Sequence, residues 1–285
     1  MEFEAFLLNT MPNTERWHLD ATASLTSYFA NHDIKLNILS SDNHLIKQIG
    51  DNDNLTPMLR KIFRLYRFLE TDAQYGIFVD LDTAVINKHA DIRDCVENGF
   101  SYINHCIYQS DEEELTNFAK DQMSLSLDKR TWTLARKPFL HEIAFKEVGI
   151  TPKRRLNVDT GFSIFNRSVC EKVTSRMDEY GINPLTAAGK KRINFLQEEW
   201  RRQIVASELN PGLTKIHDEH ILELTLADDW EDSKIKASSS ICGSPWQVGT
   251  GGDLNLQRFS ENEFIFFHFI ASAKNGMATY SRMFR

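Results

Sequence analysis

One stretch of the chain decides its fold: Tyr75-Gly76-Ile77-Phe78-Val79-Asp80-Leu81-Asp82-Thr83-Ala84-Val85-Ile86. The apolar residues before Asp80 are β-branched or aromatic, which is typical of a buried central strand. Asp80 and Asp82 alternate with one residue between them, so on an extended chain both carboxylates point to the same face. Two carboxylates at the end of a core strand repel each other and are costly to desolvate. The stretch therefore predicts a site for Mg²⁺ or Mn²⁺, held by oxygen ligands together with a phosphate.

The composition fits a globular protein and excludes several classes. A length of 285 residues suits one large α/β domain or two small ones. The 41% hydrophobic and 26% charged residues exclude a disordered chain, and the net charge of -7 excludes a global attraction to nucleic acid or anionic membranes.

The four cysteines form no CxxC pair, which indicates reduced thiols. No apolar run approaches the ~20 residues of a membrane span, and residues 1–4 lack the basic start of a signal peptide. We therefore expect a cytoplasmic protein.

Strand and helix patterns alternate along the chain, which predicts an α/β fold. A polar, acidic stretch at 109–130 is expected to form a surface insertion, and the glycine-rich residues 243–255 a mobile lid. The expected strands are 3–8, 35–39, 75–79, 100–105, 156–166 and the apolar stretch from 264, and the expected helices are 14–31, 55–70, 91–98, 168–180, 187–207 and a stretch from 217.

Two polar features of the first hundred residues are candidates for a binding site. Asn9 and Thr10 follow the first strand, where open α/β sheets bind nucleotides, although a helix-entry turn explains them equally well. The helix at 55–70 carries Lys61 and Arg64 beside its apolar stripe. They form either a solvated basic face or a contact to a bound diphosphate sugar, since this helix directly precedes the strand that leads to the two aspartates.

Three later stretches add candidates. Gly161 opens an apolar strand and would allow a ligand or backbone to approach closely, or form only a bulge. His217 and His220 could share a helix face, but a zinc site would need a third ligand that the motif lacks. His268 lies in an apolar run, where a histidine is usually a core residue, and Lys274 six residues later favours a site instead.

Together these stretches resemble a GT-A glycosyltransferase, of the family 8 type found in glycogenin and the bacterial lipopolysaccharide galactosyltransferases. The resemblance lies in the order and spacing of four motifs over most of the chain. Asp80-Leu81-Asp82 resembles the DxD motif, Val158-Asp159-Thr160-Gly161-Phe162 resembles F-N-A-G-V, Asp218-Glu219-His220-Ile221-Leu222 resembles D-Q-D-I-L, and His268 to Lys274 resembles H-F-x-G-x-x-K. Departures from the family include Asp159 for Asn, Glu219 for Gln, Ala271 for Gly, and Asn275-Gly276 for the usual Pro-Trp.

The resemblance implies a fold and a set of roles. It implies a single GT-A-like domain over 1–285, with a mixed, mostly parallel central sheet flanked by helices, a nucleotide-binding half at 1–105 and an acceptor half at 106–285. The implied metal ligands are Asp80, Asp82 and His268. The implied catalytic residues are Arg64, which orients the sugar or a phosphate, and Asp218 and Glu219, which hold or stabilise the sugar. The implied donor-binding residues are Asn9, Thr10, Lys61, Asp80, Asp159, Thr160, Gly161 and Lys274.

The implied activity is metal-dependent transfer of a sugar from a nucleoside-diphosphate sugar, a UDP-sugar in this family, with retention of configuration. The basic residues at 153–155 and 190–202 would suit an anionic acceptor such as modified DNA, while a saccharide or lipopolysaccharide precursor and a protein remain alternatives. A phosphotransferase or nuclease could also use the aspartates, but would normally need further clustered carboxylates. A non-catalytic nucleotide-sugar-binding protein is the third hypothesis.

Overall fold

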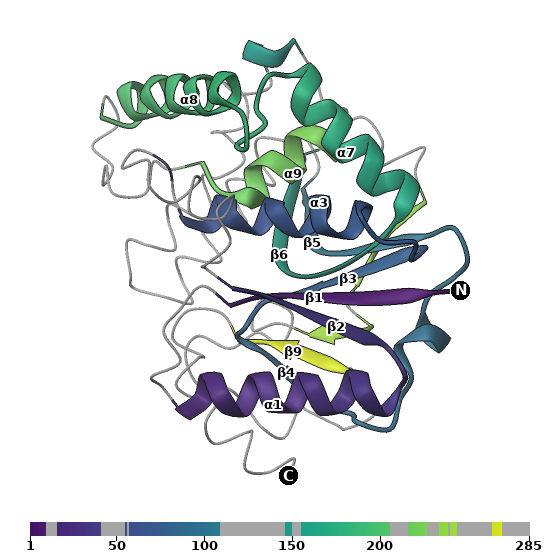
Figure 1. Cartoon of the computed structure of the whole chain (residues 1–285). Coiled ribbons are helices and arrows are strands. Elements are labelled where there is room, and N and C mark those ends of the chain that lie inside the picture. Colours follow the sequence, from purple (N-terminus) through teal and green to yellow (C-terminus); the bar gives the residue numbers. More distant parts are fainter. Residues whose placement is uncertain are drawn as a thin grey trace.

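A six-stranded sheet forms the centre of the molecule (Figure 1). The computed structural model describes residues 1–9, 16–40, 55, 57–108, 146–149, 155–205, 216–226, 234–238, 240–243 and 264–269. The strand order is β2-β1-β3-β6-β5-β7. Their bounds are β1 Phe3–Asn9, β2 Lys35–Ser40, β3 Tyr75–Val79, β5 Ser101–Tyr108, β6 Arg155–Asn166 and β7 Ile235–Ala237.

The directions of the strands confirm the mixed, mostly parallel sheet that the resemblance implies. β1 pairs in parallel with β2 and β3, and β5 pairs in parallel with β7. β6 lies antiparallel to both of its neighbours, β3 and β5, so it is the strand of this sheet that runs against the others. This reversal places Phe162, within β6, opposite Val79 at the carboxyl end of β3.

A second, three-stranded sheet joins the segment after Asp82 to the C-terminal part of the chain. Its order is β4-β9-β8, with β4 at Thr83–Val85, β9 at Phe266–His268 and β8 at Cys242–Gly243. β4 and β9 are antiparallel, and their register places Thr83 opposite His268. A pairing across more than 180 positions of sequence therefore fixes the histidine beside the aspartates.

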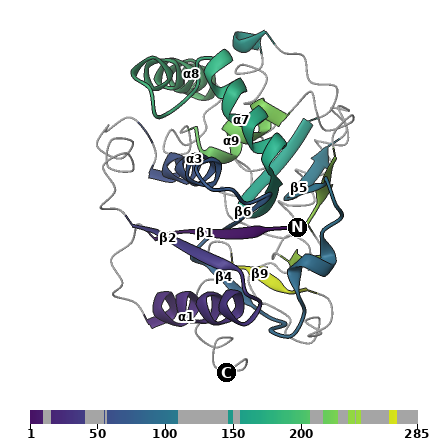
Figure 2. The same ribbon diagram turned by 45° about the vertical axis from the view of Figure 1, so that its right-hand side comes forward.

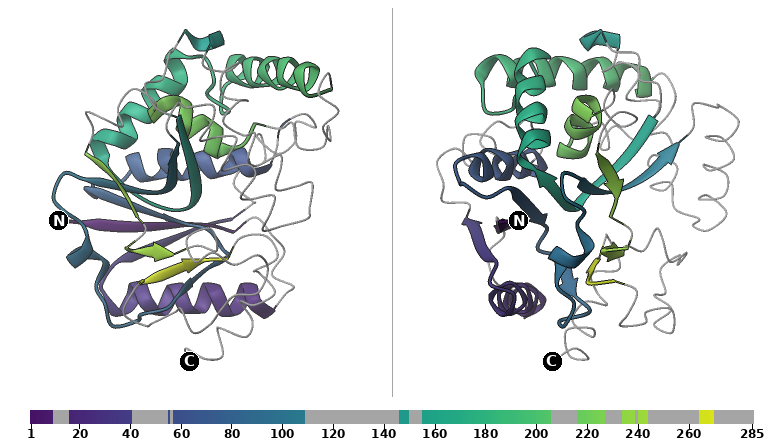
Figure 3. Two further views of the ribbon diagram at one scale, coloured as in Figure 1. Left: turned by 180° about the vertical axis from the view of Figure 1, so that it is seen from behind. Right: turned by 90° about the vertical axis from the view of Figure 1, so that its right-hand side faces the viewer.

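Helices cover both faces of the central sheet (Figures 1 and 2). On one face lie η1, α3, α7 and α9, with α8 farther out, and on the other lies α1 with the small sheet between it and part of the central sheet, as the rotated views also show (Figure 3). The bounds are α1 Arg16–Asn31, η1 Pro57–Ile62, α3 Phe63–Leu69, η2 Ile92–Cys95, α7 Arg167–Glu179, α8 Ala187–Val205 and α9 Asp218–Leu226.

Strand β3 is buried on both sides, as its unbroken apolar sequence predicts. Phe78 packs in a core with α3, α7 and α9, whereas Ile77 and Val79 pack in the opposite core with α1. The alternation follows from the two-residue repeat of a strand. Strands from both predicted halves of the chain share this sheet, and the division into a nucleotide half and an acceptor half stays a prediction.

Two predicted helices differ from the structure. The expected helix at 55–70 begins as the 3₁₀ helix η1 and becomes α-helical only at Phe63, and the one at 91–98 is a single 3₁₀ turn at Ile92–Cys95. Periodicity alone does not separate an α-helix from short 3₁₀ segments. The predicted insertion at 109–130 and residues 244–255 of the glycine-rich stretch lie outside the described residues. Among the described helices none combines the length and apolarity that crossing a bilayer requires.

Candidate active site

The two aspartates lie on a turn at the carboxyl end of β3. The strand ends at Val79, and the amide of Thr83 donates to the carbonyl oxygen of Asp80 at 3.0 Å, which closes a β-turn. The expectation that both carboxylates project from one extended chain is therefore wrong. Thr83 then begins β4, so the aspartates occupy the junction of the two sheets.

The turn and strand β9 bring three potential metal ligands together. In the described part of the chain, Asp80, Asp82 and His268 form one cluster in which a ligand atom from each lies within 4.8 Å of the others. His268 Nε2 lies 3.1 Å from Asp82 Oδ1, and the amide of Phe269 donates to the carbonyl oxygen of Asp82 at 2.8 Å. All three side chains are largely buried, so their positions are set by packing. The convergence that the resemblance implies is present.

An irregularity in β6 places Gly161 directly against His268. The pairing of β5 with β6 shifts between Ile103 and Asn104, whose partners are Ser163 and Asp159, so residues 160–162 bulge from the ladder. A Cβ at Gly161 would lie 1.9 Å from Cε1 and 2.0 Å from Nδ1 of the His268 ring. Only glycine leaves room for the imidazole there. The carbonyl oxygen of Gly161 accepts a hydrogen bond from the amide of Asp80 at 2.9 Å.

Asp159 holds the other edge of the imidazole. Its Oδ2 lies 3.1 Å from His268 Nδ1 and 3.1 Å from Asn104 Nδ2, while its Oδ1 accepts from the amide of Gly161 at 2.9 Å. Burial raises the pKa of Asp159, but the charge of His268 and these hydrogen bonds outweigh it and the pKa is lowered. Burial lowers the pKa of His268, but Asp159 and Asp82 outweigh it and raise that pKa well above its usual value.

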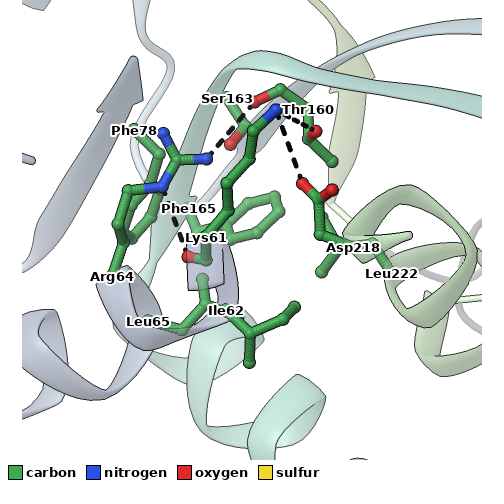
Figure 4. A pocket seen from close by; sticks show the side chains of 10 residues that line it. All are labelled: Lys61, Ile62, Arg64, Leu65, Phe78, Thr160, Ser163, Phe165, Asp218 and Leu222. Carbon is green, nitrogen blue, oxygen red and sulfur yellow. Dashed lines mark hydrogen bonds and ion pairs between the residues drawn. The ribbon is translucent and has the colours of Figure 1, made fainter. Parts of the chain in front are cut away.

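Two cations bind Asp80 from η1 and α3. Lys61 Nζ pairs with Asp80 Oδ2 and donates to Thr160 Oγ1 at 3.2 Å. Arg64, which is 3% exposed, donates to Asp80 Oδ1 at 3.0 Å, to the carbonyl of Val79 at 2.9 Å and to that of Thr160 at 3.4 Å. Arg64 thus braces the end of β3 against β6, and Figure 4 shows its side chain beside Thr160 of β6.

Asp218, the first residue of α9, faces the same ammonium group (Figure 4). Its Oδ2 lies 3.8 Å from Lys61 Nζ, and it is 1% exposed. Burial raises the pKa of Asp218, and the charge of Lys61 offsets this only in part. Burial lowers the pKa of Lys61, but Asp218 and Asp80 outweigh it and raise that pKa. Lys61 therefore stays charged between two carboxylates.

The charges of this region fit a divalent cation. Four carboxylates, from Asp80, Asp82, Asp159 and Asp218, surround two permanently charged groups, Lys61 and Arg64, and the titratable His268. Two ligands that coordinate one small cation at adjacent positions lie about 3 Å apart, close to the 3.1 Å between His268 Nε2 and Asp82 Oδ1. Oxygen and imidazole donors suit Mn²⁺, and the oxygen donors suit Mg²⁺.

The remaining predicted site residues have different outcomes. Thr160 lies in the cluster through its contacts to Lys61 and Arg64. Asn9 ends β1 at the same edge of the sheet as Asp80, because Leu7 pairs with Val79. Glu219 follows Asp218 in the first turn of α9. Thr10 and Lys274 lie outside the described residues, so their roles stay predictions.

The HDEH stretch gives no zinc cluster in the described residues. The backbone amide of His217 donates to Nδ1 of His220 at 3.0 Å, and no third metal-ligating side chain joins these histidines among those residues. This geometry supports a helix N-terminus closed by a side chain instead.

Sequence reasoning missed three polar residues that support the site. Asn104 donates to Asp159, and Thr83 Oγ1 donates to the carbonyl of Gly161 at 3.2 Å. Glu223 is 1% exposed and accepts from the amide of Val158 at 2.7 Å, which fixes β6 to α9. A carboxylate within the apolar run 221–226 was the available signal for Glu223.

Comparisons with known proteins give structural likeness at low sequence identity. No protein-family model matches the chain, and no curated protein matches it. Solved structures that resemble it include glycosyltransferases. One, involved in glycosylation of the major capsid of PBCV-1, has 8% identity and a TM-score of 0.45 over 99% of this chain and 100% of its own.

The galactosyltransferase LgtC, solved with donor and acceptor sugar analogues, has 11% identity and a TM-score of 0.46 over 98% of this chain and 95% of its own. Mouse xyloside xylosyltransferase 1 has 10% identity and a TM-score of 0.43 over 96% of this chain and 99% of its own. Because these TM-scores are below 0.5, the function must be argued from the residues of the site itself.

Proposed function

We propose that this protein is a metal-dependent glycosyltransferase that moves a sugar from a nucleoside-diphosphate sugar to an acceptor hydroxyl, with retention of configuration. The observation that carries the proposal is the convergence of Asp80, Asp82 and His268 beside the buried pair Lys61–Asp218. Asp80, Asp82 and His268 can hold a divalent cation. The Lys61–Asp218 pair offers an ammonium group and a carboxylate to the same ligand.

The reaction divides charge in a way that this site can stabilise. The bond between the anomeric carbon and the diphosphate oxygen breaks, and its electron pair leaves with the diphosphate. A bond forms from the acceptor hydroxyl oxygen to the anomeric carbon, and the hydroxyl proton passes to the released diphosphate. Mn²⁺ or Mg²⁺, held by Asp80, Asp82 and His268, would neutralise the negative charge on the leaving diphosphate.

Lys61 is the better placed of the two cations to contact a ligand. Its side chain is 19% exposed and its ammonium group lies between Asp80 and Asp218, whereas the Arg64 side chain is 4% exposed and already donates to three carbonyl oxygens. We therefore assign phosphate or sugar contact to Lys61, and to Arg64 the fixing of Asp80, in addition to any contact it makes with the donor. Lys274 would add a second cation for the diphosphate.

Asp218 is the carboxylate best suited to the sugar. It lies at the N-terminus of α9 and is buried, and the ammonium group of Lys61 lies 3.8 Å from its Oδ2, beyond a direct hydrogen bond. Buried carboxylates are normally satisfied, so a ligand hydroxyl is a natural partner. Glu219, next in the helix, would stabilise positive charge that develops on the sugar.

Donor hydrolysis tests the proposal. Nucleoside-diphosphate sugars, beginning with UDP-sugars, are incubated with the protein and Mn²⁺ or Mg²⁺, and release of the nucleoside diphosphate is measured. The variant Asp82→Asn should lose metal-dependent turnover while its unfolding midpoint stays near that of the wild type. Asp72→Asn is the matched control, because Asp72 is an exposed carboxylate in the short segment between α3 and β3.

Three outcomes would overturn the proposal. Full activity in Asp82→Asn would remove the metal assignment. Stabilisation by a nucleotide sugar without any turnover would indicate a binding protein, since a ligand raises stability by mass action whether or not it reacts. Cleavage of a nucleic acid strand that depends on Asp82 would indicate a nuclease.

The acceptor belongs to this proposal as three alternatives: a saccharide or lipopolysaccharide precursor, a protein, or modified DNA. Salt-dependent binding of DNA would favour the last, because contacts to phosphates release counterions. Binding that is absent at low salt would exclude it.

A further inference from the structure

The carboxylate of Asp159 lies where the described structure offers three hydrogen-bond donors. The amide of Gly161 donates to Oδ1 at 2.9 Å, Asn104 Nδ2 donates to Oδ2 at 3.1 Å, and His268 Nδ1 lies 3.1 Å from the same Oδ2. Only a carboxylate accepts on both of its oxygens, whereas an asparagine would present an NH₂ group on one side. The side chain at this position is therefore matched to a donor at His268 Nδ1.

The ring of His268 has two distinct edges. Nδ1 faces Asp159, and Nε2 faces Asp82 and the proposed metal position. A cation can bind Nε2 only when it displaces the proton of that nitrogen, and the neutral, metal-bound imidazole then keeps its single proton on Nδ1. An acceptor on the outer nitrogen of a metal-ligating histidine both selects this tautomer and orients the ring.

We propose that Asp159 is a positioning residue of the metal site: it accepts the Nδ1 proton of His268, so that Nε2 is presented to the cation with the ring fixed between β6 and β9. The inference rests on the metal site proposed above. It differs from the contact to the donor that the resemblance implies for this position, because Asp159 acts through His268.

Rigid surroundings support the role. Asp159 is fixed by the backbone of the β6 bulge and by Asn104 of the neighbouring strand β5, and Gly161 leaves no space on its side of the ring. The carboxylate therefore cannot follow a displaced ring. A fixed carboxylate, imidazole and cation in line would form a preorganised unit.

Replacement by asparagine gives a specific expectation. In Asp159→Asn, the amide oxygen can still accept from Gly161, and the NH₂ group then faces Nδ1. This arrangement favours the tautomer with its proton on Nε2, which cannot bind a cation. Affinity for Mn²⁺, measured by calorimetry on the full chain, should fall by about 10- to 100-fold, the usual effect of losing such a partner.

A second variant separates position from charge. Asn104→Asp combined with Asp159→Asn keeps the net charge and allows a hydrogen bond between positions 104 and 159, but leaves an amide facing His268. We expect Mn²⁺ binding to stay weak. Recovery of wild-type affinity would show that only the charge matters and would overturn the inference. With Mg²⁺ bound, ¹⁵N spectra of the wild-type histidines should show His268 protonated on Nδ1 and not on Nε2.

The controls distinguish failure of the proposed metal site from failure of the positioning role of Asp159. If the wild type binds Mn²⁺ and Asp82→Asn does not, the metal site stands, and unchanged affinity in Asp159→Asn then refutes the positioning role alone. If the wild type binds neither Mn²⁺ nor Mg²⁺, both proposals fail. Should Asp159→Asn not fold, Asn104→Ala removes one support of Asp159 without touching His268, and unchanged affinity in that variant refutes the role.

Discussion

Replacing Gly161 by alanine is the sharpest test of the geometry around His268. The new Cβ would lie 1.9 Å from Cε1, 2.0 Å from Nδ1 and 2.3 Å from Nε2 of the imidazole. An ordinary contact begins at 3.4 Å, so the ring must move by 3.4 minus 1.9, or 1.5 Å. The φ of Gly161 lies outside the left-handed region, so the effect comes from the Cβ and not from backbone strain.

The ring has little freedom to make this move. Asp82 and Asp159 each lie 3.1 Å from one of its nitrogens, and the pairing of β9 with β4 fixes its backbone. Metal sites tolerate shifts of about 0.2 Å in ligand distance. A shift of 1.5 Å therefore removes His268 from the metal. We expect Mn²⁺ affinity to fall by more than about 100-fold, beyond the usual effect of losing a partner of a ligand.

Overpacking alone also destabilises a fold, so the assay needs a control of the same kind. A Cβ at Gly76 would lie 2.8 Å from Cζ of Phe78 and 2.9 Å from Cγ of Phe68, in the core away from His268. Both Gly→Ala variants should lose about 1–3 kcal/mol of unfolding free energy in urea. Only Gly161→Ala should lose Mn²⁺ binding in calorimetry. Wild-type Mn²⁺ affinity in a folded Gly161→Ala protein would refute this account of the site.

Two further predictions concern stability without metal. Lys61→Met leaves the buried Asp218 without its cation and should lower the free energy of unfolding in urea by about 3–5 kcal/mol. The double variant Lys61→Met/Asp218→Asn should regain most of this stability. Equal losses in the single and the double variant would contradict the pairing. Tyr28→Phe removes an acceptor for the amide of Ile92 and a donor to the carbonyl of Ala90, and should cost about 1–3 kcal/mol at neutral pH with Mn²⁺ affinity unchanged. Burial raises the pKa of Tyr28 above its usual 10.0, so its contribution is complete below that pH and is lost as the pH rises above it. The wild type should therefore lose more stability than Tyr28→Phe in alkaline solution, and parallel pH profiles would contradict this.

The sequence predicts the local elements well because their signals are local. The apolar run before Asp80 and the polar residues after it identify β3 and its end, and the order of strands and helices indicates the α/β class. The turn at Asp80–Thr83 was missed because alternation of two aspartates fits a strand and a turn equally. The 3₁₀ helix η1 was missed because its apolar spacing also fits the first turns of an α-helix.

Contacts between residues far apart in the sequence could not be predicted from such local patterns. That Lys61 would pair with Asp80 and Asp218 depends on the position of β6 between β3 and β5, which local patterns do not specify. The role of Asp159 depends on a three-residue bulge, Thr160–Phe162, in the pairing of β6 with β5. Bulges redirect side chains without leaving a period in the sequence.

Under the proposed function, the buried charges give Lys61 two successive roles. Lys61 and Arg64 together hold Asp80, so the turn can fold before any metal is present. Binding of a divalent cation at Asp80 would compete with the bond from Lys61 and free its ammonium group for a new partner. Asp218 already lies 3.8 Å from that group, and a diphosphate would bring further negative charge. One lysine would then serve as the counter-ion of the empty site and as the anchor of its ligand.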